Sequence, residues 1–286
     1  MIAIVDGGST KCDWVILENS GKIHLKTTTL GFNPNIINPD FILQEIDKNP
    51  ELFFLKNHIE QVFFYGSGCG TPDNALKVKN EFKQTFPHAA VSIKEDMTAA
   101  AYAAYNGKPA IVCILGTGSN SCFFDGDKIR IDLPSLGFLI GDEGSGSALG
   151  KHLLRRFFMK KLPQDLENDF RATYNLTIEE AIRRMYHNPR ANAYLGEFNK
   201  FIAERKKHPY FQNMVFDELK NFLDYQVLPY PEAGETEINF IGYIAFIYED
   251  ILRSAAAELN LKIGKVVQKP IESLVDYHKK YILNLN

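Results

Sequence analysis

The chain has 286 residues, of which 45% are hydrophobic and 23% are charged, and its formal net charge is -3. This length exceeds what one hydrophobic core usually serves, so we expect two domains, and the composition is that of an ordinary globular protein. The small net charge, with Lys and Arg scattered along the chain, argues against nucleic acid as a partner.

Apolar segments are too short for a signal peptide or a membrane span. MIAIVDGGST begins with about four apolar residues, and no later stretch approaches the roughly 20 that a membrane helix needs. We therefore expect a cytoplasmic protein that does not contact a membrane. The spacing of Cys12, Cys69, Cys113 and Cys122 favours buried or loop thiols over a metal site or disulfides.

The first third of the chain predicts strands followed by alternating helices and strands. Three strands, IAIV, DWVIL and KIHLKTT, surround a Gly-rich turn and a second turn at Asn19-Ser20-Gly21. Asn106-Gly107 ends an Ala-rich helix, and we place the boundary between two lobes there. Between these points the pattern predicts a helix over about 39–55, the strand VFFYG, a helix from Pro72-Asp73, a strand over 90–93 and the Ala-rich helix over 97–105.

The opening pattern returns after the boundary. AIVCILGTGSNSCFF places a Gly/Thr/Ser turn between two apolar strands, as IAIVDGGSTKCDWVIL does, which indicates a weak internal repeat. The segment from 145 to about 225 is mostly helical, and we expect its aromatic side chains in the core. The other predicted elements are strands over 128–131, 238–241 and 265–267, and helices over 244–259 and from 271.

The two Gly-rich turns are candidate phosphate-binding loops. They are Asp6-Gly7-Gly8-Ser9-Thr10 and Gly116-Thr117-Gly118-Ser119, and glycine lets backbone N–H groups approach a phosphate closely. Either turn alone could be a plain β-hairpin, but the pair could hold a polyphosphate, with Asp6 orienting water around Mg²⁺. Neither loop matches the P-loop or Rossmann patterns. Lys11 could be a solvated or paired lysine or a phosphate ligand.

Four segments together resemble the signatures of a known family. DGGSTKCDW, EDMTAAAYAAY, LGTGSNS and GFLIGDEGSGSALG occur in the order and spacing of the BadF/BadG/BcrA/BcrD ATPase family, in its N-acetylglucosamine kinase-like branch. The resemblance implies an α/β, two-lobed actin-like ATPase (ribonuclease H-like) fold with ATP and Mg²⁺ in a central cleft. The N-terminal lobe is then residues 1–107, with a C-terminal helix of about 271–286 packing back on it, and the C-terminal lobe is residues 108–270. A homodimer and a small amino-sugar substrate are further implications.

The resemblance also assigns roles to single residues. Asp96 matches the catalytic base of the family's sugar kinases, although an aspartate before Met97 and Thr98 would also suit a helix N-cap. We expect Glu95 to be an exposed acid in the first turn of that helix.

Three further residues match sugar-binding positions of the family. They are Asn35, with Asn33 as its alternative, Thr117 of the second loop, and Asp142. The alternatives are turn formation around Pro34 for the asparagines, and helix capping for the Asp142-Glu143 pair. The role of Glu143 within its motif stays open.

The sequence departs from the family pattern where adenine is expected to bind. Gly242 opens the expected helix, but a bulky Tyr243 follows where relatives carry small residues. Tyr243 could stack on adenine, narrow the pocket or pack in the core. Cys12 replaces the usual Thr or Ser, which would remove one hydroxyl from the first loop.

These features predict an ATP-dependent kinase that phosphorylates the 6-hydroxyl of an N-acetylated amino sugar. N-acetylglucosamine is the first candidate, beside N-acetylmuramic acid and glucosamine. One alternative is an ATPase or regulatory subunit of the same family that serves an iron–sulfur cluster, but such clusters need closely placed cysteines, which this sequence lacks. The other is a non-catalytic sugar- or nucleotide-binding module, which Tyr243 and Cys12 suggest but Asp96, Asp142 and both loops oppose.

Overall fold

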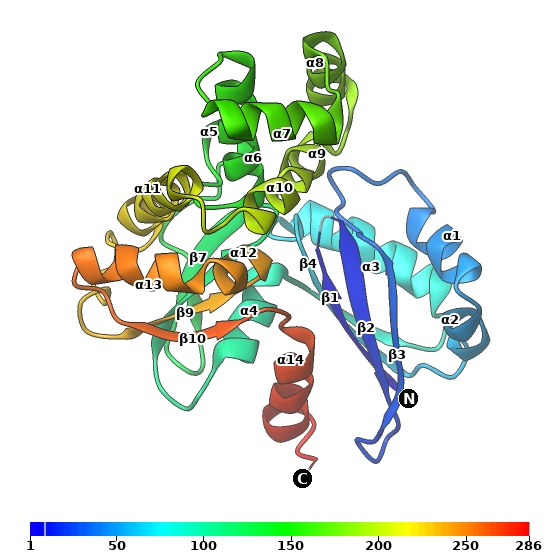
Figure 1. Cartoon of the computed structure of the whole chain (residues 1–286). Coiled ribbons are helices and arrows are strands. Elements are labelled where there is room, and N and C mark those ends of the chain that lie inside the picture. The colour runs from blue at the N-terminus through cyan, green and yellow to red at the C-terminus, as the bar shows by residue number, and fades with distance from the viewer. Residues whose placement is uncertain (9, 286) are drawn as a thin grey trace. The chain divides into compact units, whose positions relative to one another are not determined.

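The computed structural model describes residues 1–8 and 10–285 and divides into two compact units. Unit 1 comprises Met1–Asn106 and Lys269–Asn286, and unit 2 comprises Gly107–Gln268. Each unit contains one five-stranded mixed sheet with helices packed on it (Figure 1). Within the described residues, no helix combines the length and apolar character needed to cross a membrane.

The sheet of unit 1 has the strand order β3-β2-β1-β4-β5. β2 is antiparallel to both β1 and β3, whereas β1, β4 and β5 run parallel to one another. A tight turn can connect the antiparallel strands, but the parallel ones need longer crossovers, and here the crossovers contain helices. The strands are β1 Ile2–Gly7, β2 Lys11–Leu17, β3 Ile23–Leu30, β4 Gln61–Gly66 and β5 Ala90–Glu95.

The helix predicted over 39–55 is two helices in the structure. Asn49 separates them because its side chain accepts a hydrogen bond from the Leu52 amide and Pro50 occupies the first turn of the second helix. The helices of unit 1 are α1 Phe41–Lys48, α2 Pro50–Leu55, α3 Pro72–Thr85, α4 Asp96–Ala104 and α14 Ile271–Tyr277, followed by the π-helical turn η1 His278–Ile282.

Successive residues of β4 point to opposite faces of the unit 1 sheet. Phe64 joins an aromatic cluster with Phe82, whose ring centroid lies 4.9 Å away, in the core beneath α1 and α3. Tyr65 instead makes a buried 2.7 Å hydrogen bond to His278. The chain's last helix, α14, packs against α4 within this unit (Figure 1).

Unit 2 repeats the strand pattern of unit 1. Its sheet has the order β8-β7-β6-β9-β10, with β7 antiparallel to β6 and β8, and with β6, β9 and β10 parallel. The weak internal repeat of the sequence is therefore present as a repeated topology. The strands are β6 Ala110–Leu115, β7 Ser119–Phe124, β8 Ile129–Arg130, β9 Glu237–Ile241 and β10 Ile263–Val267.

Helices make up most of unit 2. The predicted helix over 244–259 is divided at Tyr248, and the predicted aromatic core is confirmed, because Phe157, Phe198 and Phe211 are buried in one cluster. The helices are α5 Gly137–Ile140, α6 Gly146–Phe158, α7 Gln164–Tyr174, α8 Ile178–His187, α9 Ala191–Glu197, α10 Asn199–Glu204, α11 Pro209–Gln226, α12 Tyr243–Ile247 and α13 Glu249–Glu258. All four cysteines are buried, and none forms a disulfide within the described residues.

Candidate functional site

In unit 1 the parallel strands β1, β4 and β5 end side by side. Their register aligns Gly7 with Gly66 and Gly66 with Glu95. The residues that follow these strands therefore meet at one edge of the sheet, which is where open α/β sheets place ligands. Asp96, directly after β5, lies at this edge.

Asp96 is the first residue of α4 and not its N-cap. Glu95 occupies the N-cap position and makes no capping bond with its side chain. Glu95 is partly buried at the end of β5, so its prediction as an exposed first-turn acid is wrong. Asp96 Oδ1 accepts a 2.9 Å hydrogen bond from the Met97 amide, and the side chain also bonds to Ser67.

Burial raises the pKa of Asp96 to about 6, and the negative charge of Glu95 acts in the same direction. Hydrogen bonds from Met97 and Ser67 oppose the rise. A carboxyl group with this pKa exchanges protons close to neutral pH, which suits a general base.

Asp6, near the end of β1, is a second carboxyl group with a raised pKa. Burial raises its pKa to about 7, with further contributions from the charges of Asp13 and Asp96, while Lys11 opposes them. Lys11 itself is paired with Asp13, with 2.8 Å between Nζ and Oδ1. Among the described residues no group of three or more His, Cys, Asp or Glu side chains could hold a metal ion directly, but a hydrated cation such as Mg²⁺ next to Asp6 would relieve this concentration of negative charge.

The first glycine loop lies between β1 and β2, with Gly7, Gly8 and Thr10 among its described residues. The Gly8 amide donates to the Lys11 carbonyl at 2.9 Å, so this amide is already used within the turn. A Cβ on Gly7 would lie 2.5 Å from the ring of Phe64, so core packing alone requires glycine there. Thr10 is exposed, and Ser9 lies outside the described residues. Cys12 does not deprive the first loop of a hydroxyl group, because its side chain is buried in the core.

Asn35 belongs to a group of amide side chains around the loop after β4. Its Oδ1 accepts from Asn74 Nδ2 at 3.0 Å, and its backbone amide donates to Asn33 Oδ1 at the same distance. Asn74 also donates to the Gly68 carbonyl at 2.9 Å. Asn35 is exposed, and its side chain is held by Asn74, so it can offer its amide to a ligand.

Ser67 is a site residue that the sequence reasoning missed. It bonds to Asp96 through its side chain and to the Gly7 carbonyl through its amide at 2.8 Å, so it links two of the three strand ends. The signal was present: GSGCG, residues 66–70, directly follows a buried strand and has the same glycine-rich character as the two predicted loops.

In unit 2 the second glycine loop and Gly242 follow the parallel strands β6 and β9. The register pairs Ile114 with Ile241, so both segments lie at the same end of the sheet. The first turn of α6 is hydrogen-bonded to the second glycine loop. The Gly146 amide donates to the Gly116 carbonyl at 2.8 Å, and the Ser147 amide donates to the Thr117 carbonyl at 3.0 Å.

The glycines of this loop differ in what surrounds them. A Cβ on Gly116 would meet no atom within 4 Å, so nothing in its unit requires a glycine there. A Cβ on Gly118 would lie 3.0 Å from the Asp142 carboxylate. Asp142 Oδ1 also accepts from the Ser119 amide at 3.2 Å. The predicted sugar residue Asp142 and the predicted phosphate loop are therefore in contact.

Helix capping does not explain the Asp142-Glu143 pair. Ser145 is the N-cap of α6, and its hydroxyl accepts from the Ala148 amide at 3.2 Å. Asp142 has a left-handed backbone, with φ of 61°, and is only partly buried. Burial raises the pKa of its carboxyl group, with the charge of Glu143 acting in the same direction and the Ser119 amide opposing it.

Gly242 is required by its backbone. Its φ is 122°, and a Cβ would lie 2.3 Å from the Leu115 carbonyl oxygen. Tyr243, the next residue, begins α12 and is 48% exposed. The core-packing alternative for Tyr243 is therefore wrong, and its ring is available to a ligand.

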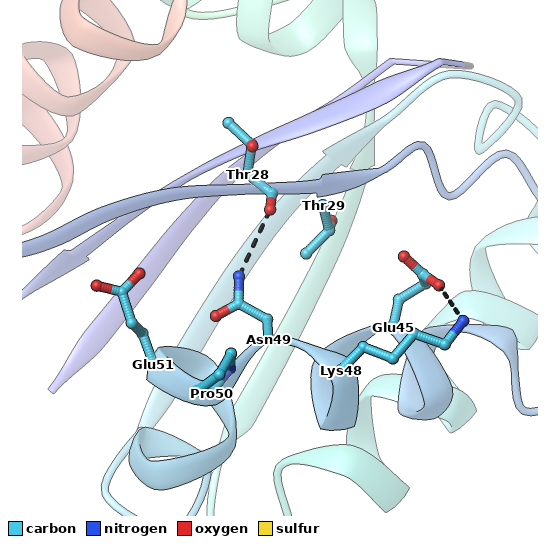
Figure 2. Close-up of a pocket in the computed structure, with 7 residues that line it drawn as sticks. All are labelled: Thr28, Thr29, Glu45, Lys48, Asn49, Pro50 and Glu51. Carbon is cyan, nitrogen blue, oxygen red and sulfur yellow. Dashed lines mark hydrogen bonds and ion pairs between the residues drawn. The ribbon is translucent and has the colours of Figure 1, made fainter.

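A separate pocket of unit 1 contains none of the predicted site residues. It lies between β3 and the α1–α2 pair, where Asn49 Nδ2 reaches the Thr28 carbonyl at 3.5 Å and Lys48 pairs with Glu45 at 2.7 Å (Figure 2). Its lining residues are Thr28, Thr29, Glu45, Lys48, Asn49, Pro50 and Glu51. Internal bonds already occupy the side chains of Glu45, Lys48 and Asn49, so we assign the pocket no role.

Comparisons with known proteins place this geometry in context. Residues 5–204 match the sequence model of the BadF/BadG/BcrA/BcrD ATPase family. A candidate N-acetylglucosamine kinase from Porphyromonas gingivalis is 35% identical, with a TM-score of 0.91 over 98% of this chain and 99% of that one. Comparison with curated protein sequences gives no significant match.

Two more distant solved structures share the fold. A candidate N-acetylglucosamine kinase from Chromobacterium violaceum is 15% identical, with a TM-score of 0.70 over 96% of this chain and 98% of that one. A ROK family glucokinase from Streptomyces griseus, solved with glucose and AMPPNP, is 16% identical, with a TM-score of 0.54 over 96% and 97% of the two chains.

Proposed function

The chain belongs to the BadF/BadG/BcrA/BcrD ATPase family and is a sugar kinase, and we propose that it phosphorylates the 6-hydroxyl of an N-acetylated amino sugar. The α/β fold of actin-like ATPases and sugar kinases, predicted from the sequence, is confirmed. N-acetylglucosamine is the first candidate substrate, because the relative from Porphyromonas gingivalis is described as a candidate kinase for that sugar.

The proposal depends most on the surroundings of Asp96. A kinase base must accept the proton of the attacking hydroxyl, and it must be oriented and close to its working pKa. The bonds from Ser67 and Met97 fix the Asp96 carboxylate, and burial brings its pKa to about 6. We therefore assign the catalytic base to Asp96 and the orientation of its carboxylate to Ser67.

In unit 2 we assign the ATP phosphates to the second glycine loop. The open space at Gly116 leaves room for a phosphate, and the amides of Thr117 and Gly118 are the donors that could meet it. Gly242 and the exposed ring of Tyr243 follow the neighbouring strand and are assigned to adenine. Stacking on an aromatic ring is a common way to bind a nucleotide base.

In unit 1 we assign a supporting role to the first loop. Gly7, Gly8, Ser9 and Thr10 stay predicted phosphate contacts, and the use of the Gly8 amide within its own turn leaves fewer donors than in the second loop. Asp6 is assigned to Mg²⁺ through water, since burial and the charges of Asp13 and Asp96 raise its pKa and a bound cation would favour the ionised carboxylate. Bound Mg²⁺ would neutralise phosphate charge.

Sugar contacts are assigned to Asn35 in unit 1 and to Thr117 and Asp142 in unit 2. A carboxylate can accept hydrogen bonds from two hydroxyl groups, and an amide can both donate and accept, so each of these side chains is chemically suited to a polyol with an N-acetyl group. Asp142 carries most of the assignment, because its contact with Ser119 connects it to the phosphate loop.

A substrate panel tests the proposal. The protein is incubated with Mg²⁺, ATP and N-acetylglucosamine, N-acetylmuramic acid, glucosamine or glucose, and kcat/KM is measured for each. We expect the highest value for an N-acetylated sugar, and 6-deoxy-N-acetylglucosamine should inhibit without being phosphorylated. Phosphorylation of the 6-deoxy analogue, or a preference for glucose, would contradict the assignment of the substrate.

A further inference from the structure

Glu218 is a buried carboxylate outside the residues described above. It lies on α11, beyond the family-matched residues 5–204, and is 5% exposed. Its Oε2 lies 3.0 Å from His152 Nε2, and its Oε1 accepts a 3.2 Å hydrogen bond from the Gly144 amide. Both carboxylate oxygens are therefore used, one by a side chain and one by backbone.

Neighbouring arginines determine the direction of the bond between His152 and Glu218. Arg155 Nη2 and Arg156 Nη1 lie 3.2 and 3.1 Å from His152 Nδ1. A guanidinium group only donates, so Nδ1 must accept and Nε2 carries the proton that is donated to Glu218. Burial raises the pKa of Glu218, but the bonds from His152 and Gly144 and the charge of Lys151 outweigh burial and lower it overall. The acceptor for the Gly144 amide is thus a carboxylate.

The Gly144 amide belongs to a turn with an unusual backbone. Asp142 and Gly144 both have positive φ, at 61° and 71°, and a Cβ on Gly144 would lie 2.8 Å from Phe222 Cβ. The Ser145 amide closes the turn by donating to the Asp142 carbonyl at 3.1 Å. Left-handed non-glycine residues persist only where their surroundings hold them, and Glu218 supplies a strong acceptor in the middle of this turn.

We propose that Glu218 is a positioning residue for sugar binding, which acts by holding the Gly144 amide and thereby the direction of the Asp142 carboxylate. The proposal rests on the proposed function in one respect, the role of Asp142 in binding sugar. His152 keeps Glu218 in place through the second oxygen. The path runs from α11 through Gly144 to Asp142 and on to the Ser119 amide.

Two double variants test whether the side chain of residue 218 must accept the hydrogen bond from the Gly144 amide. His152→Leu/Glu218→Met replaces both side chains with apolar ones and leaves the buried Gly144 amide without its acceptor, so we expect some loss of stability, and the Tm is measured first to establish that the variant is folded. His152→Leu/Glu218→Gln also lacks the hydrogen bond between residues 152 and 218, but its amide oxygen can still accept from Gly144. The two proteins therefore differ at one position, where only Gln provides an acceptor.

The first measurement does not need activity. Hydrogen exchange of a peptide that covers 141–149 should be several-fold faster in the Met variant than in the Gln variant, which should resemble the wild type. The second is steady-state kinetics, where the KM for the sugar should rise about tenfold in the Met variant with a smaller change in kcat, because Asp142 is displaced and not removed. The Gln variant should keep a sugar KM close to that of the wild type.

Equal exchange in the two variants would overturn the proposal, because the turn would then not depend on the acceptor. Faster exchange with an unchanged sugar KM would also overturn it and leave Glu218 a purely structural role. If the wild type phosphorylates no amino sugar, the proposed function fails on its own, while the exchange comparison still reports whether Glu218 holds the turn.

Discussion

Asp96 and Asp6 are the two carboxyl groups whose protonation the fold changes most clearly toward neutral pH. Both have pKa values raised by burial, and the charge of Asp96 adds to the rise at Asp6. Their roles can be separated by substitution, because an asparagine keeps the shape of the side chain but cannot accept a proton as a base.

Asp96→Asn should lower kcat by about 10²–10⁴-fold, the usual contribution of a general base. The Kd for ATP should change less than about twofold, since Asp96 belongs to unit 1 and the main nucleotide contacts are assigned to unit 2. Steady-state kinetics and calorimetry of ATP binding measure the two quantities. Loss of ATP binding with the same variant would instead give Asp96 a structural role.

Asp6→Asn should stabilise the nucleotide-free and Mg²⁺-free protein at high pH. The pKa of Asp6 is about 7 in the folded state and near 3.8 in the unfolded chain, so the folded state binds the extra proton and stability falls as the pH rises from 4 to 7. Relative to wild type, the variant should gain on the order of 2 kcal/mol between pH 5 and pH 8. Urea unfolding at the two pH values measures this gain, and an equal difference at both would refute it.

At the level of single residues, the sequence predicted the motif residues but not the residues that hold them in place through hydrogen bonds. Asp96 and Asp142 stand in recognisable segments, and GSGCG contained a readable signal for Ser67. The sequence contained no such signal for Glu218, because Glu218 lies 74 residues after the Gly144 amide to which it is bonded, and only the packing of α11 brings the two residues together.

The two glycines at the sheet edge of unit 2 should respond differently to alanine. A Cβ on Gly242 would strike the Leu115 carbonyl, whereas a Cβ on Gly116 would enter open space. Gly242→Ala should therefore lower the Tm, and Gly116→Ala should leave the Tm unchanged while weakening ATP binding about tenfold or more. Gly234→Ala, also free of contacts, is the matched control and should change neither quantity. Unchanged ATP affinity in Gly116→Ala would refute the assigned phosphate loop.

The C-terminal segment should make unit 1 sensitive to acid through His278. Burial lowers the pKa of His278 to about 4, and Lys94 adds to the effect, whereas the unfolded value is 6.5. The unfolded chain takes up the proton first, so this contribution to stability is present above pH 6.5 and is lost as the pH falls toward 4.

His278→Gln keeps a polar partner for Tyr65 but cannot titrate. The difference in unfolding free energy between wild type and variant should shrink by about 2 kcal/mol from pH 7 to pH 5. Denaturant titrations at both pH values measure the difference. A difference that is independent of pH would show that His278 does not titrate as its buried position requires.

At the level of elements, periodicity predicted the order of helices and strands better than their limits. The pattern over 39–55 continued through Asn49-Pro50, although proline and a capping asparagine are known helix-start signals. The division at Tyr248 had no comparable local signal, because that residue is placed by the core of unit 2. Tertiary packing therefore determined this helix limit, which local propensity did not predict.

For the whole molecule, the repeat was the most informative feature of the sequence. Two apolar strands around a glycine turn, found once in each half, predicted that each half would begin with the same antiparallel strands. Both sheets begin in this way and continue with two parallel strands, and each sheet ends its parallel strands at a cluster of predicted site residues. One topology thus supplies a carboxylate edge in unit 1 and a glycine-loop edge in unit 2.

The central claim is that ATP turnover by this chain depends on a sugar acceptor. The most direct test measures ADP and sugar phosphate in the same reaction, with and without N-acetylglucosamine, by chromatography and mass spectrometry. We predict one sugar phosphate for each ADP and negligible ADP when the sugar is omitted. ADP formation at the same rate without sugar, or sugar binding without any phosphorylated product, would contradict the assignment of a sugar kinase.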